Sequence, residues 1–215
     1  IQYHHVTVTI EDQVAVTHVD QVFRNDQGWT VEGTYVFPLP ADASVSSFTL
    51  WIDQQPVEAE ILSREEARQI YEDIVRQLRD PALLEYMDRG AVRASVFPIE
   101  PGEKRRIELE YTQTLPADQG LISYSYPLNT EKFSTLPLEE VVISVDVRSQ
   151  VPVRAVYSPS HPIVIDRSGD RAFRAGYEAS NITPDSNFDL YYSVSMEDIG
   201  VNLLTYRDPY TAEED

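Results

Sequence analysis

The stretch that decides the fold is Q-Y-H-H-V-T-V-T-I (Gln2–Ile10), followed after three residues by V-A-V-T-H-V-D-Q-V-F-R (Val14–Arg24). Apolar and polar residues alternate along both runs. A period of two places alternate side chains on opposite faces of a β-strand. The polar residues Glu11-Asp12-Gln13 between the runs suit a turn. The stretch therefore predicts a β-hairpin with one face in a core.

The register of this hairpin depends on the length of its loop. One two-residue loop pairs His5 with His18, and two adjacent histidines would supply part of a metal site. A three-residue loop instead pairs Val8 with Val16 and Val6 with His18, which gathers apolar residues on one face. Because a buried face fixes the register, we prefer the second pairing. The four histidines, His4, His5, His18 and His161, are then interpreted as ordinary strand residues.

Similar short runs continue along most of the chain. In the first half they fall at 29–37, 47–52, 57–62, 92–99 and 105–114. Residues 47–52 and 57–62 are expected to pair, and Pro101-Gly102 suits a tight reversal. In the second half the runs fall at 121–127, 139–148, 151–157, 162–166, 171–178 and 187–196, with a hairpin turn at Arg167-Ser-Gly-Asp170. This spacing predicts a mainly β fold, a two-layer antiparallel β-sandwich.

The one helical pattern lies between residues 63 and 90. Apolar residues recur there at three- and four-residue steps, which aligns them on one side of a helix. Ser63 and Glu66 form a capping box, Asp80-Pro81 suits a second helix start, and Gly90 suits a helix end. We expect helices at about 64–79 and 81–88, a helix pair (about 64–88) packed on the sandwich.

The composition and net charge of the chain limit the classes of partner that it is expected to bind. The chain has 215 residues and a net charge of −19, so it does not suit the neutralisation of nucleic-acid phosphates. No apolar run is long enough to span a bilayer, and the chain contains no cysteine for a disulfide framework. We therefore expect a protein partner, no nucleic acid, no membrane insertion and a monomeric fragment.

The carboxylates offer two further interpretations. Calcium takes six or more oxygen ligands, and Asp166, Asp170, Glu139 and Glu140 carry carboxylates, but D-R-S-G-D has a simpler role as a turn. A glycosidase needs two carboxyl groups that face a cleft, and no pair stands out from a solvated acidic surface. The sequence also has no G-x-S-x-G elbow and no glycine-rich phosphate loop. We expect no catalytic residue, no bound metal and no cofactor.

The aromatic residues keep a second function open. Trp51 lies between Leu50 and Ile52 and is expected in the core, since strands readily bury aromatic residues. Trp29 follows the turn residue Gly28 and is expected to be exposed. Exposed aromatic rings can form a sugar platform, so a glycan-binding β-sandwich is the alternative function.

A series of motifs in fixed order resembles a known family. The motifs are V-x-Q-V-F-R-N (Val19–Asn25), E-G-T-Y-V-F-P-L-P (Glu32–Pro40), W-I-D (Trp51–Asp53), E-A-R-x-I-Y-E (Glu66–Glu72), D-P-A-L-L-E-Y (Asp80–Tyr86) and V-F-P-I-x-P-G-E-x-R-R-I-E-L-E-Y (Val96–Tyr111). Together they resemble the VIT domain, the vault/inter-α-trypsin-inhibitor module. Later segments at 157–161, 177–181 and 189–193 resemble the region that follows this module in bacterial members.

The resemblance implies a domain plan and a role. Residues 1–117 correspond to the VIT domain, 118–205 to a β-rich continuation that completes or abuts the sandwich, and 206–215 to an acidic linker. In this family a von Willebrand A adhesion domain usually follows, and its D-x-S-x-S metal motif does not occur in residues 1–215. The implied role is a non-catalytic protein-interaction and scaffolding module, extracellular or in the cell envelope. Leu203 and Leu204, just ahead of the linker, are expected either to contact the next domain or to close the last strand of this one.

Overall fold

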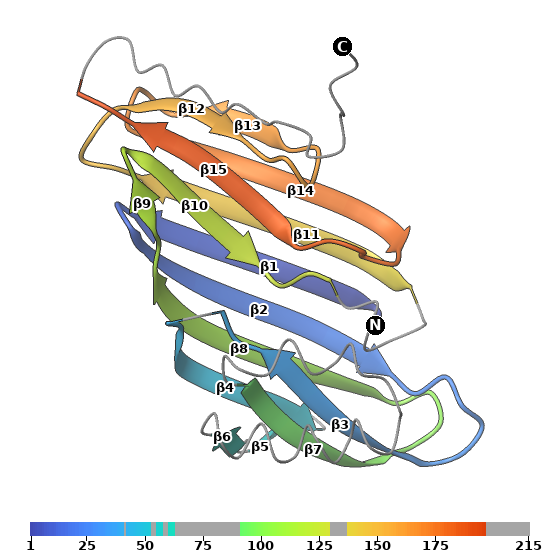
Figure 1. Ribbon diagram of the computed structural model, residues 1–215. Coiled ribbons are helices and arrows are strands. Elements are labelled where there is room, and N and C mark those ends of the chain that lie inside the picture. The colour runs from blue at the N-terminus through green and yellow to red at the C-terminus, as the bar shows by residue number, and fades with distance from the viewer. Residues whose placement is uncertain (41, 53–54, 58–59, 63–90, 130–136, 197–215) are drawn as a thin grey trace, which may run out of the picture.

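The computed structural model describes residues 1–215 except 41, 53–54, 58–59, 63–90, 130–136 and 197–215 (Figure 1). Within the described residues every regular element is a β-strand, so the mainly β prediction is confirmed. The predicted helix pair (about 64–88), the 206–215 linker, Leu203 and Leu204 lie outside the described residues.

The strands follow the predicted runs closely in the second half of the chain and less closely in the first. They are β1 Tyr3–Glu11, β2 Val14–Arg24, β3 Val31–Pro38, β4 Ser44–Ile52, β5 Gln55–Val57, β6 Glu60–Leu62, β7 Ala91–Ile99, β8 Lys104–Thr114, β9 Ala117–Asp118, β10 Leu121–Tyr126, β11 Leu138–Arg148, β12 Val153–Tyr157, β13 Val164–Arg167, β14 Ala172–Ile182 and β15 Phe188–Val194.

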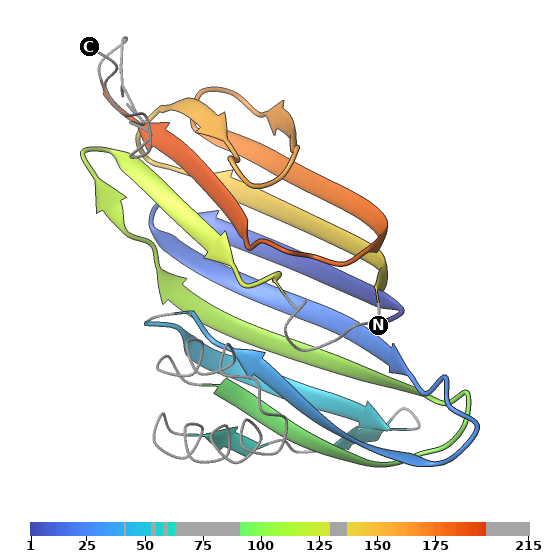
Figure 2. The same ribbon diagram turned by 45° about the vertical axis from the view of Figure 1, so that its right-hand side comes forward.

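A large sheet with two smaller sheets on one of its faces makes up the architecture (Figures 1 and 2). The large sheet has eight strands in the order β13-β14-β11-β1-β2-β8-β4-β5. The smaller sheets are β12-β15-β10-β9 and β3-β7-β6. One buried cluster joins Val8 of the large sheet to Tyr124 and Phe37 of the two smaller sheets. Both smaller sheets therefore pack on the same face, which we call the inner face, and the opposite face is the outer face.

The expectation of purely antiparallel sheets is wrong at one pair. Strands β1 and β11 run parallel, with His4 opposite Val141, whereas the other paired strands are antiparallel. Strand β11 also pairs with β14, and β14 with β13, so these three strands extend the same sheet that the first hairpin begins. The division between residues 1–117 and 118–205 stays a prediction about domain limits. In space, strands from both stretches lie side by side in the large sheet, and residues of both contribute to one buried cluster.

The first hairpin forms, but neither register considered from the sequence is correct. Asp12 and Gln13 form a two-residue loop, in which Asp12 has a positive φ of 54°. The resulting register pairs Val6 with Val19 and Val8 with Thr17. The sequence interpretation assumed that Val14 and Val16 face the core. Instead, the alternating buried residues of β2 are Ala15, Thr17, Val19 and Gln21, and Val22 is also buried. Because Thr17 and Gln21 are polar, the pattern of apolar residues did not reveal which side of β2 faces the core.

The turns are partly as predicted. Pro101-Gly102 reverses the chain from β7 to β8, and Gly102 has a φ of 78°. Strands β13 and β14 form the expected hairpin, with Gly169 also at a φ of 78°. The predicted pairing of 47–52 with 57–62 forms only in part: Val57 of β5 lies opposite Leu50 of β4, whereas β6 joins β7 in another sheet.

Candidate functional site

The two faces of β1 and β2 carry different polar chemistry. Successive residues of a strand point to opposite faces, so His4 lies on the inner face and His5 on the outer face. His4 is fully buried, and the His5 side chain is 40% exposed. We name the inner group, His4, Thr17, Gln21, Tyr111, Tyr124 and Tyr126, the interior polar cluster. We name the outer group, Tyr3, His5, Asp20, Trp51, Arg106 and Glu108, the outer network.

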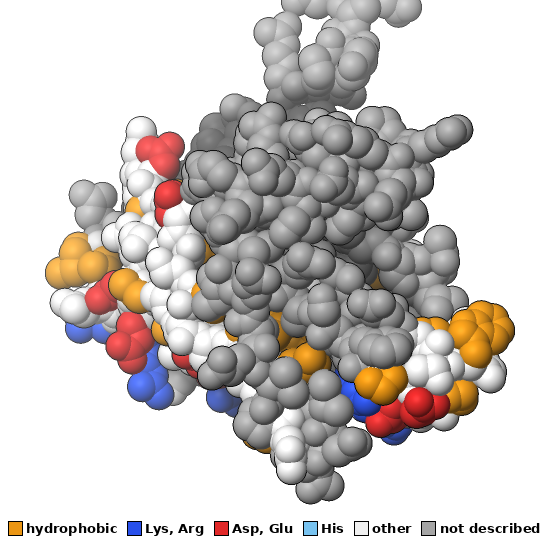
Figure 3. All heavy atoms as spheres, turned by 90° about the horizontal axis from the view of Figure 1, so that it is seen from below, with side chains coloured by type: hydrophobic (Ala, Val, Ile, Leu, Met, Phe, Trp, Pro, Cys, Tyr) orange, Lys and Arg blue, Asp and Glu red, His pale blue; other side chains and the backbone are white. Residues whose placement is uncertain are grey.

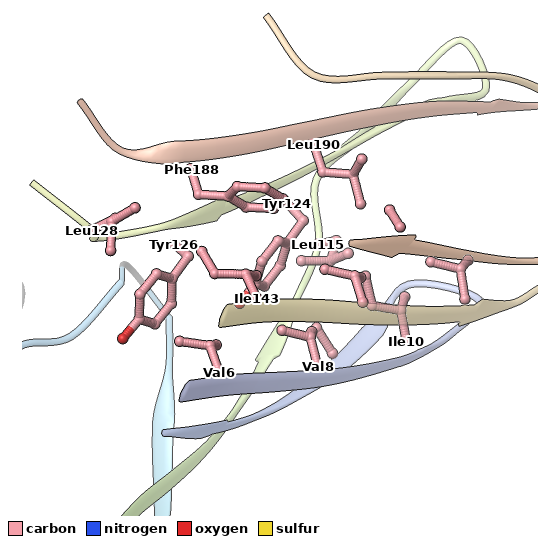
Figure 4. Close-up of a cluster of buried hydrophobic side chains, with 14 of the residues drawn as sticks. Val6, Val8, Ile10, Leu115, Tyr124, Tyr126, Leu128, Ile143, Phe188 and Leu190 are labelled. Atoms are coloured by element: carbon pink, nitrogen blue, oxygen red, sulfur yellow. The ribbon is translucent and has the colours of Figure 1, made fainter. Parts of the chain in front are cut away.

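Hydrogen bonds hold the interior polar cluster together across β1, β2 and β10. Gln21 Nε2 donates to His4 Nδ1 at 2.6 Å, and His4 Nε2 lies 2.7 Å from the Tyr126 hydroxyl. A second pair joins the Thr17 and Tyr124 hydroxyls at 2.9 Å. Figure 4 shows Tyr124 and Tyr126 projecting from β10 toward the strand that carries Val6 and Val8. Polar groups so deeply buried must find partners inside the protein.

Burial fixes the protonation states of this cluster. It lowers the pKa of His4 to about 3, with a smaller contribution from the charges of His5 and the N-terminus. Burial also raises the pKa of the Tyr126 and Tyr111 hydroxyls well above their usual value. The cluster is therefore neutral near pH 7. Gln21 Oε1 has no hydrogen-bond partner within the described part of the chain, and the Tyr111 hydroxyl lies beside Thr17 and Tyr124 without a well-formed hydrogen bond.

The outer network centres on an arginine–carboxylate pair between β2 and β8. Arg106 donates from Nε and Nη2 to the two oxygens of Asp20, both at 2.9 Å. The Tyr3 hydroxyl donates to the same carboxylate at 3.1 Å. Burial alone would raise the pKa of Asp20, but the Arg106 and Tyr3 hydrogen bonds outweigh it and lower that pKa. The Asp20 hydrogen bond in turn raises the pKa of Arg106. Both groups are therefore ionised.

The network continues through Glu108 on one side and His5 on the other. Glu108 accepts from Arg106 at 2.8 Å and from the Trp51 indole at 2.5 Å. His5 stacks on Tyr3 with ring centroids 4.5 Å apart, and its Nε2 lies 2.5 Å from a carboxylate oxygen of Glu140. Contacts therefore run without a break from β4 across β8, β2 and β1 to β11.

Cross-strand register explains why these residues meet. One row across the sheet holds Trp51, Arg106, Val22 and Tyr3, and the next holds Thr49, Glu108, Asp20 and His5. Directly opposed residues lie close enough for side-chain contact. Arg106 remains 45% exposed, so solvent reaches the network. It thus presents fixed charges, hydrogen-bonding groups and ring faces on an open surface.

The pairing of His5 with His18 that was considered for a metal site does not form. His5 lies opposite Asp20, and His18 lies opposite Thr7 and Glu110. His161 lies elsewhere and contacts the ring of Tyr177 at 4.6 Å. Among the residues that the structure describes, no group of three or more His, Cys, Asp or Glu side chains is placed to hold a metal.

The carboxylates weighed for calcium have other neighbours. Glu139 pairs with Arg24 at 3.2 Å, and Glu140 pairs with His5. Asp166 lies opposite Arg174 in the β13–β14 pair, whereas Asp170 lies in the following turn and accepts a backbone hydrogen bond from Val153 through its carbonyl. The structure therefore does not bring these four residues together.

The two tryptophans lie in different settings. Trp51 was expected in the core, and this is wrong: Leu50 is buried, and Trp51 lies half-buried on the outer face. Trp29 is 64% exposed, as expected. Sequence reasoning also missed Asp20, Arg106 and Glu108. The alternation in R-R-I-E-L-E-Y (Arg105–Tyr111) was a usable signal, but it did not identify their partners.

The charge pattern at the lower end of the molecule is mixed. Figure 3, the view from below, shows acidic and basic side chains adjoining one another on the described surface. Among the described residues, no helix is long and apolar enough to cross a membrane.

The fold and the outer network define a class, a mainly β module with an ordered polar and aromatic sheet face. The chain belongs to the VIT family, because the Vault protein inter-alpha-trypsin domain model matches residues 1–111. The predicted resemblance is thereby confirmed.

Several curated proteins are similar to part of the chain. Mouse von Willebrand factor A domain-containing protein 5A is 28% identical over 166 residues, covering 68% of this chain and 21% of that protein. The human protein of the same name is 30% identical, covering 57% and 16%. Human protein mono-ADP-ribosyltransferase PARP4 is 31% identical, covering 52% and 6%. The chain thus spans about a fifth or less of these relatives.

A solved structure shares the fold. A Legionella pneumophila protein described as nutrient binding superimposes with a TM-score of 0.64 at 14% identity, covering 89% of this chain and 66% of that one. This similarity concerns the fold alone.

Proposed function

We propose that the chain is a non-catalytic protein-interaction module of a secreted or cell-surface protein, and that it supports a von Willebrand A adhesion domain of the same protein. Membership of the VIT family supports this role, as do relatives named for their von Willebrand A domains. In this proposal the outer network is the contact surface.

The observation that carries the proposal is the composition and order of that network. Trp, Tyr and Arg are the residues most often found at the energetic centre of protein interfaces. Here Trp51, Tyr3 and Arg106 are held in place by hydrogen bonds to two carboxylates. Side chains that are already ordered lose less conformational entropy when a partner binds.

Affinity measurements test the proposal directly. Binding of the von Willebrand A domain to this chain is measured by calorimetry for the original sequence and for Trp51→Ala combined with Arg106→Ala. The matched control is Arg174→Ala, which removes an exposed outer-face arginine that pairs with Asp146 at 2.8 Å. The double variant should weaken binding at least tenfold and the control should leave it unchanged. Equal affinities for all three proteins would contradict the proposed surface.

One observation favours the alternative glycan-binding function. Trp29 is 64% exposed, and Asn25 fixes its loop by donating to the backbone carbonyls of Trp29 and Ile99 at 2.9 Å. A glycan array with the original sequence and with Trp29→Ala tests this alternative. Selective binding that the substitution abolishes would support a glycan site and displace the outer network as the primary surface.

A further inference from the structure

The exposed face of the β12-β15-β10-β9 sheet carries a small group of polar and aromatic side chains. Figure 4 shows Tyr124, Tyr126, Phe188 and Leu190 pointing from β10 and β15 into the core. Because successive residues of a strand point to opposite faces, the alternate residues of both strands point away from the core. We name five outward-facing residues of this sheet the tyrosine platform: Ser123, Ser125, Tyr157, Asp189 and Tyr191. The sheet packs on the inner face, so the platform and the outer network lie on opposite sides of the molecule.

Two tyrosine rings stack at the centre of the platform. Tyr157 lies opposite Tyr191, with ring centroids 5.3 Å apart and planes that differ by 13°. Rings this close and this nearly parallel cannot lie side by side in one plane, so each turns one face toward the other. On its other side in the same row, Tyr191 lies opposite Ser123, whose side chain is a single hydroxymethyl group. No large side chain of that row therefore covers the second face of the Tyr191 ring.

Hydrogen-bonding groups lie beside that ring face. Ser125 lies opposite Asp189 in the next row, about 7 Å from Ser123 along β10. Asp189 uses its backbone amide to donate to the Ser160 hydroxyl at 2.8 Å. Among the residues that the structure describes, the two serine hydroxyls of β10 and the Asp189 carboxylate form no hydrogen bond. A ligand on the ring would therefore meet two groups that donate and accept and one that only accepts.

This combination suits a neutral sugar. The C–H face of a pyranose ring is apolar and packs on an aromatic ring, whereas its hydroxyl groups lie at the ring edge and pair with serine hydroxyls. A carboxylate has two acceptor oxygens and can accept from two neighbouring sugar hydroxyls. A quaternary ammonium is held by several ring faces directed at it, but here Tyr157 covers the other face of Tyr191. An anionic ligand would be repelled by Asp189 and by the net charge of −19.

We propose that the tyrosine platform binds a neutral saccharide. A pyranose ring packs on the open face of Tyr191, and its hydroxyl groups bond to Asp189 and to the two serines of β10. This inference goes beyond the proposed function, because it needs no protein partner and uses a different face of the molecule. It also differs from the alternative glycan site, since Trp29 lies between β2 and β3.

The experiment is a titration of the ¹⁵N-labelled chain with maltotriose, cellotriose, mannotriose and lactose, followed by NMR. Tetramethylammonium chloride is titrated in parallel. At least one saccharide should shift the signals of β10 and β15, with an affinity that does not depend on ionic strength, since the ligand is uncharged. Absence of shifts with all four saccharides would overturn the inference. Binding of tetramethylammonium at these strands without binding of a saccharide would overturn it too.

Paired variants test whether the saccharide lies on the Tyr191 ring, and the spectrum of each variant shows that it is folded. Ser123→Val places a branched side chain, which suits a strand, beside the open ring face. It should weaken binding about fivefold, a size typical of one lost aromatic contact. Ser144→Val makes the same change at a half-buried serine on the outer face of β11 and should leave the affinity unchanged. Equal losses for the two variants would overturn the inference.

Two substitutions of Tyr191 separate the ring from its hydroxyl. Tyr191→Ala removes the ring and should weaken binding about fivefold, whereas Tyr191→Phe keeps the ring and should bind normally. Unchanged affinity in Tyr191→Ala would contradict the assignment of the ring.

Trp29→Ala distinguishes the platform from the alternative glycan site and should leave saccharide binding unchanged. Loss of binding in Trp29→Ala but not in Ser123→Val would place the saccharide at Trp29 and overturn the inference. None of these measurements uses the von Willebrand A domain. Failure of the saccharide to bind therefore leaves the proposed function standing, and failure of the domain to bind leaves the platform standing.

Discussion

His4 and His5 are neighbours in one strand, and their surroundings differ completely. His4 lies in a closed cluster of neutral groups, where burial lowers its pKa to about 3. His5 lies on an open sheet face among ionised side chains and touches Glu140. The same side-chain type thus helps specify the core on one face and contributes to a surface on the other. The difference teaches that burial, rather than residue type, decides which polar groups belong to the core and which remain open to solvent.

The largest expected effect is on stability at the inner face. His4→Ala removes a buried ring and leaves the Tyr126 hydroxyl and the Gln21 amide without their partner. The free energy of unfolding should fall by about 4 kcal/mol, from the lost packing and the unpaired polar groups together. His5→Ala, the adjacent control, should cost less than about 1 kcal/mol. Urea melts of the two variants measure both values, and similar midpoints would show that the two faces contribute alike.

The second effect is a pH dependence that belongs to His4. Above about pH 6.5 the ring is neutral in both the folded and unfolded chains, so its contribution to stability is fully present. As the pH falls, the unfolded chain binds a proton that the folded chain excludes until about pH 3. Stability should therefore fall by about 3 kcal/mol between pH 7 and pH 4 from this group alone. His4→Gln should lose this part of the slope, which chemical denaturation at each pH measures. An unchanged slope would mean that His4 is protonated in the folded chain.

These two predictions depend on a core that the sequence revealed only in part. The alternation of β1 and β2 and the glycine turns were readable, because they are local signals. The register was not, because Thr17 and Gln21 occupy inner positions that a search for apolar residues rejects. The parallel pairing of β1 with β11 joins segments that are far apart in the sequence, and no short sequence pattern predicts it.

The outer network was hidden for a related reason. Predicting its contacts requires the correct pairing register of several strands. An error in the register of one strand pair assigns every side chain of that strand to a different neighbour. Trp51 was assigned to the core because Leu50 and Ile52 are also apolar, so the segment has no alternation that marks its faces. Asp20 and Arg106 lie far apart in the sequence and carry no motif of their own.

A smaller effect distinguishes paired from unpaired hydroxyls in the interior polar cluster. Tyr126→Phe removes a hydrogen bond to His4 and should cost about 1–2 kcal/mol. Tyr111→Phe removes a buried hydroxyl that lies beside Thr17 and Tyr124 without a well-formed hydrogen bond. It should be neutral or stabilise the fold by up to about 1 kcal/mol. Thermal melts of both variants make the comparison. A larger loss for Tyr111→Phe would show that its hydroxyl is bonded in solution.

The smallest stability effect belongs to the outer network. Asp20→Asn weakens the pair with Arg106, and the side chains are 19% and 45% exposed, so solvent screens the interaction. The loss should be about 1 kcal/mol or less at pH 7. Because the pKa of Asp20 is lowered in the folded state, its contribution is present near neutral pH and lost as the pH falls through that value. Denaturation at pH 7 and pH 3 tests this sign, and a loss as large as that of His4→Ala would remove the contrast between the two faces.

The central claim is that the outer face contacts a protein partner and the inner face does not. Hydroxyl-radical footprinting with mass spectrometry reads the accessibility of individual side chains with and without the von Willebrand A domain. We predict that oxidation of Tyr3, His5 and Trp51 falls when the domain is present, while Trp29 is unchanged and Tyr124 and Tyr126 stay protected throughout. Unchanged oxidation of Tyr3, His5 and Trp51 in the bound state would contradict the account.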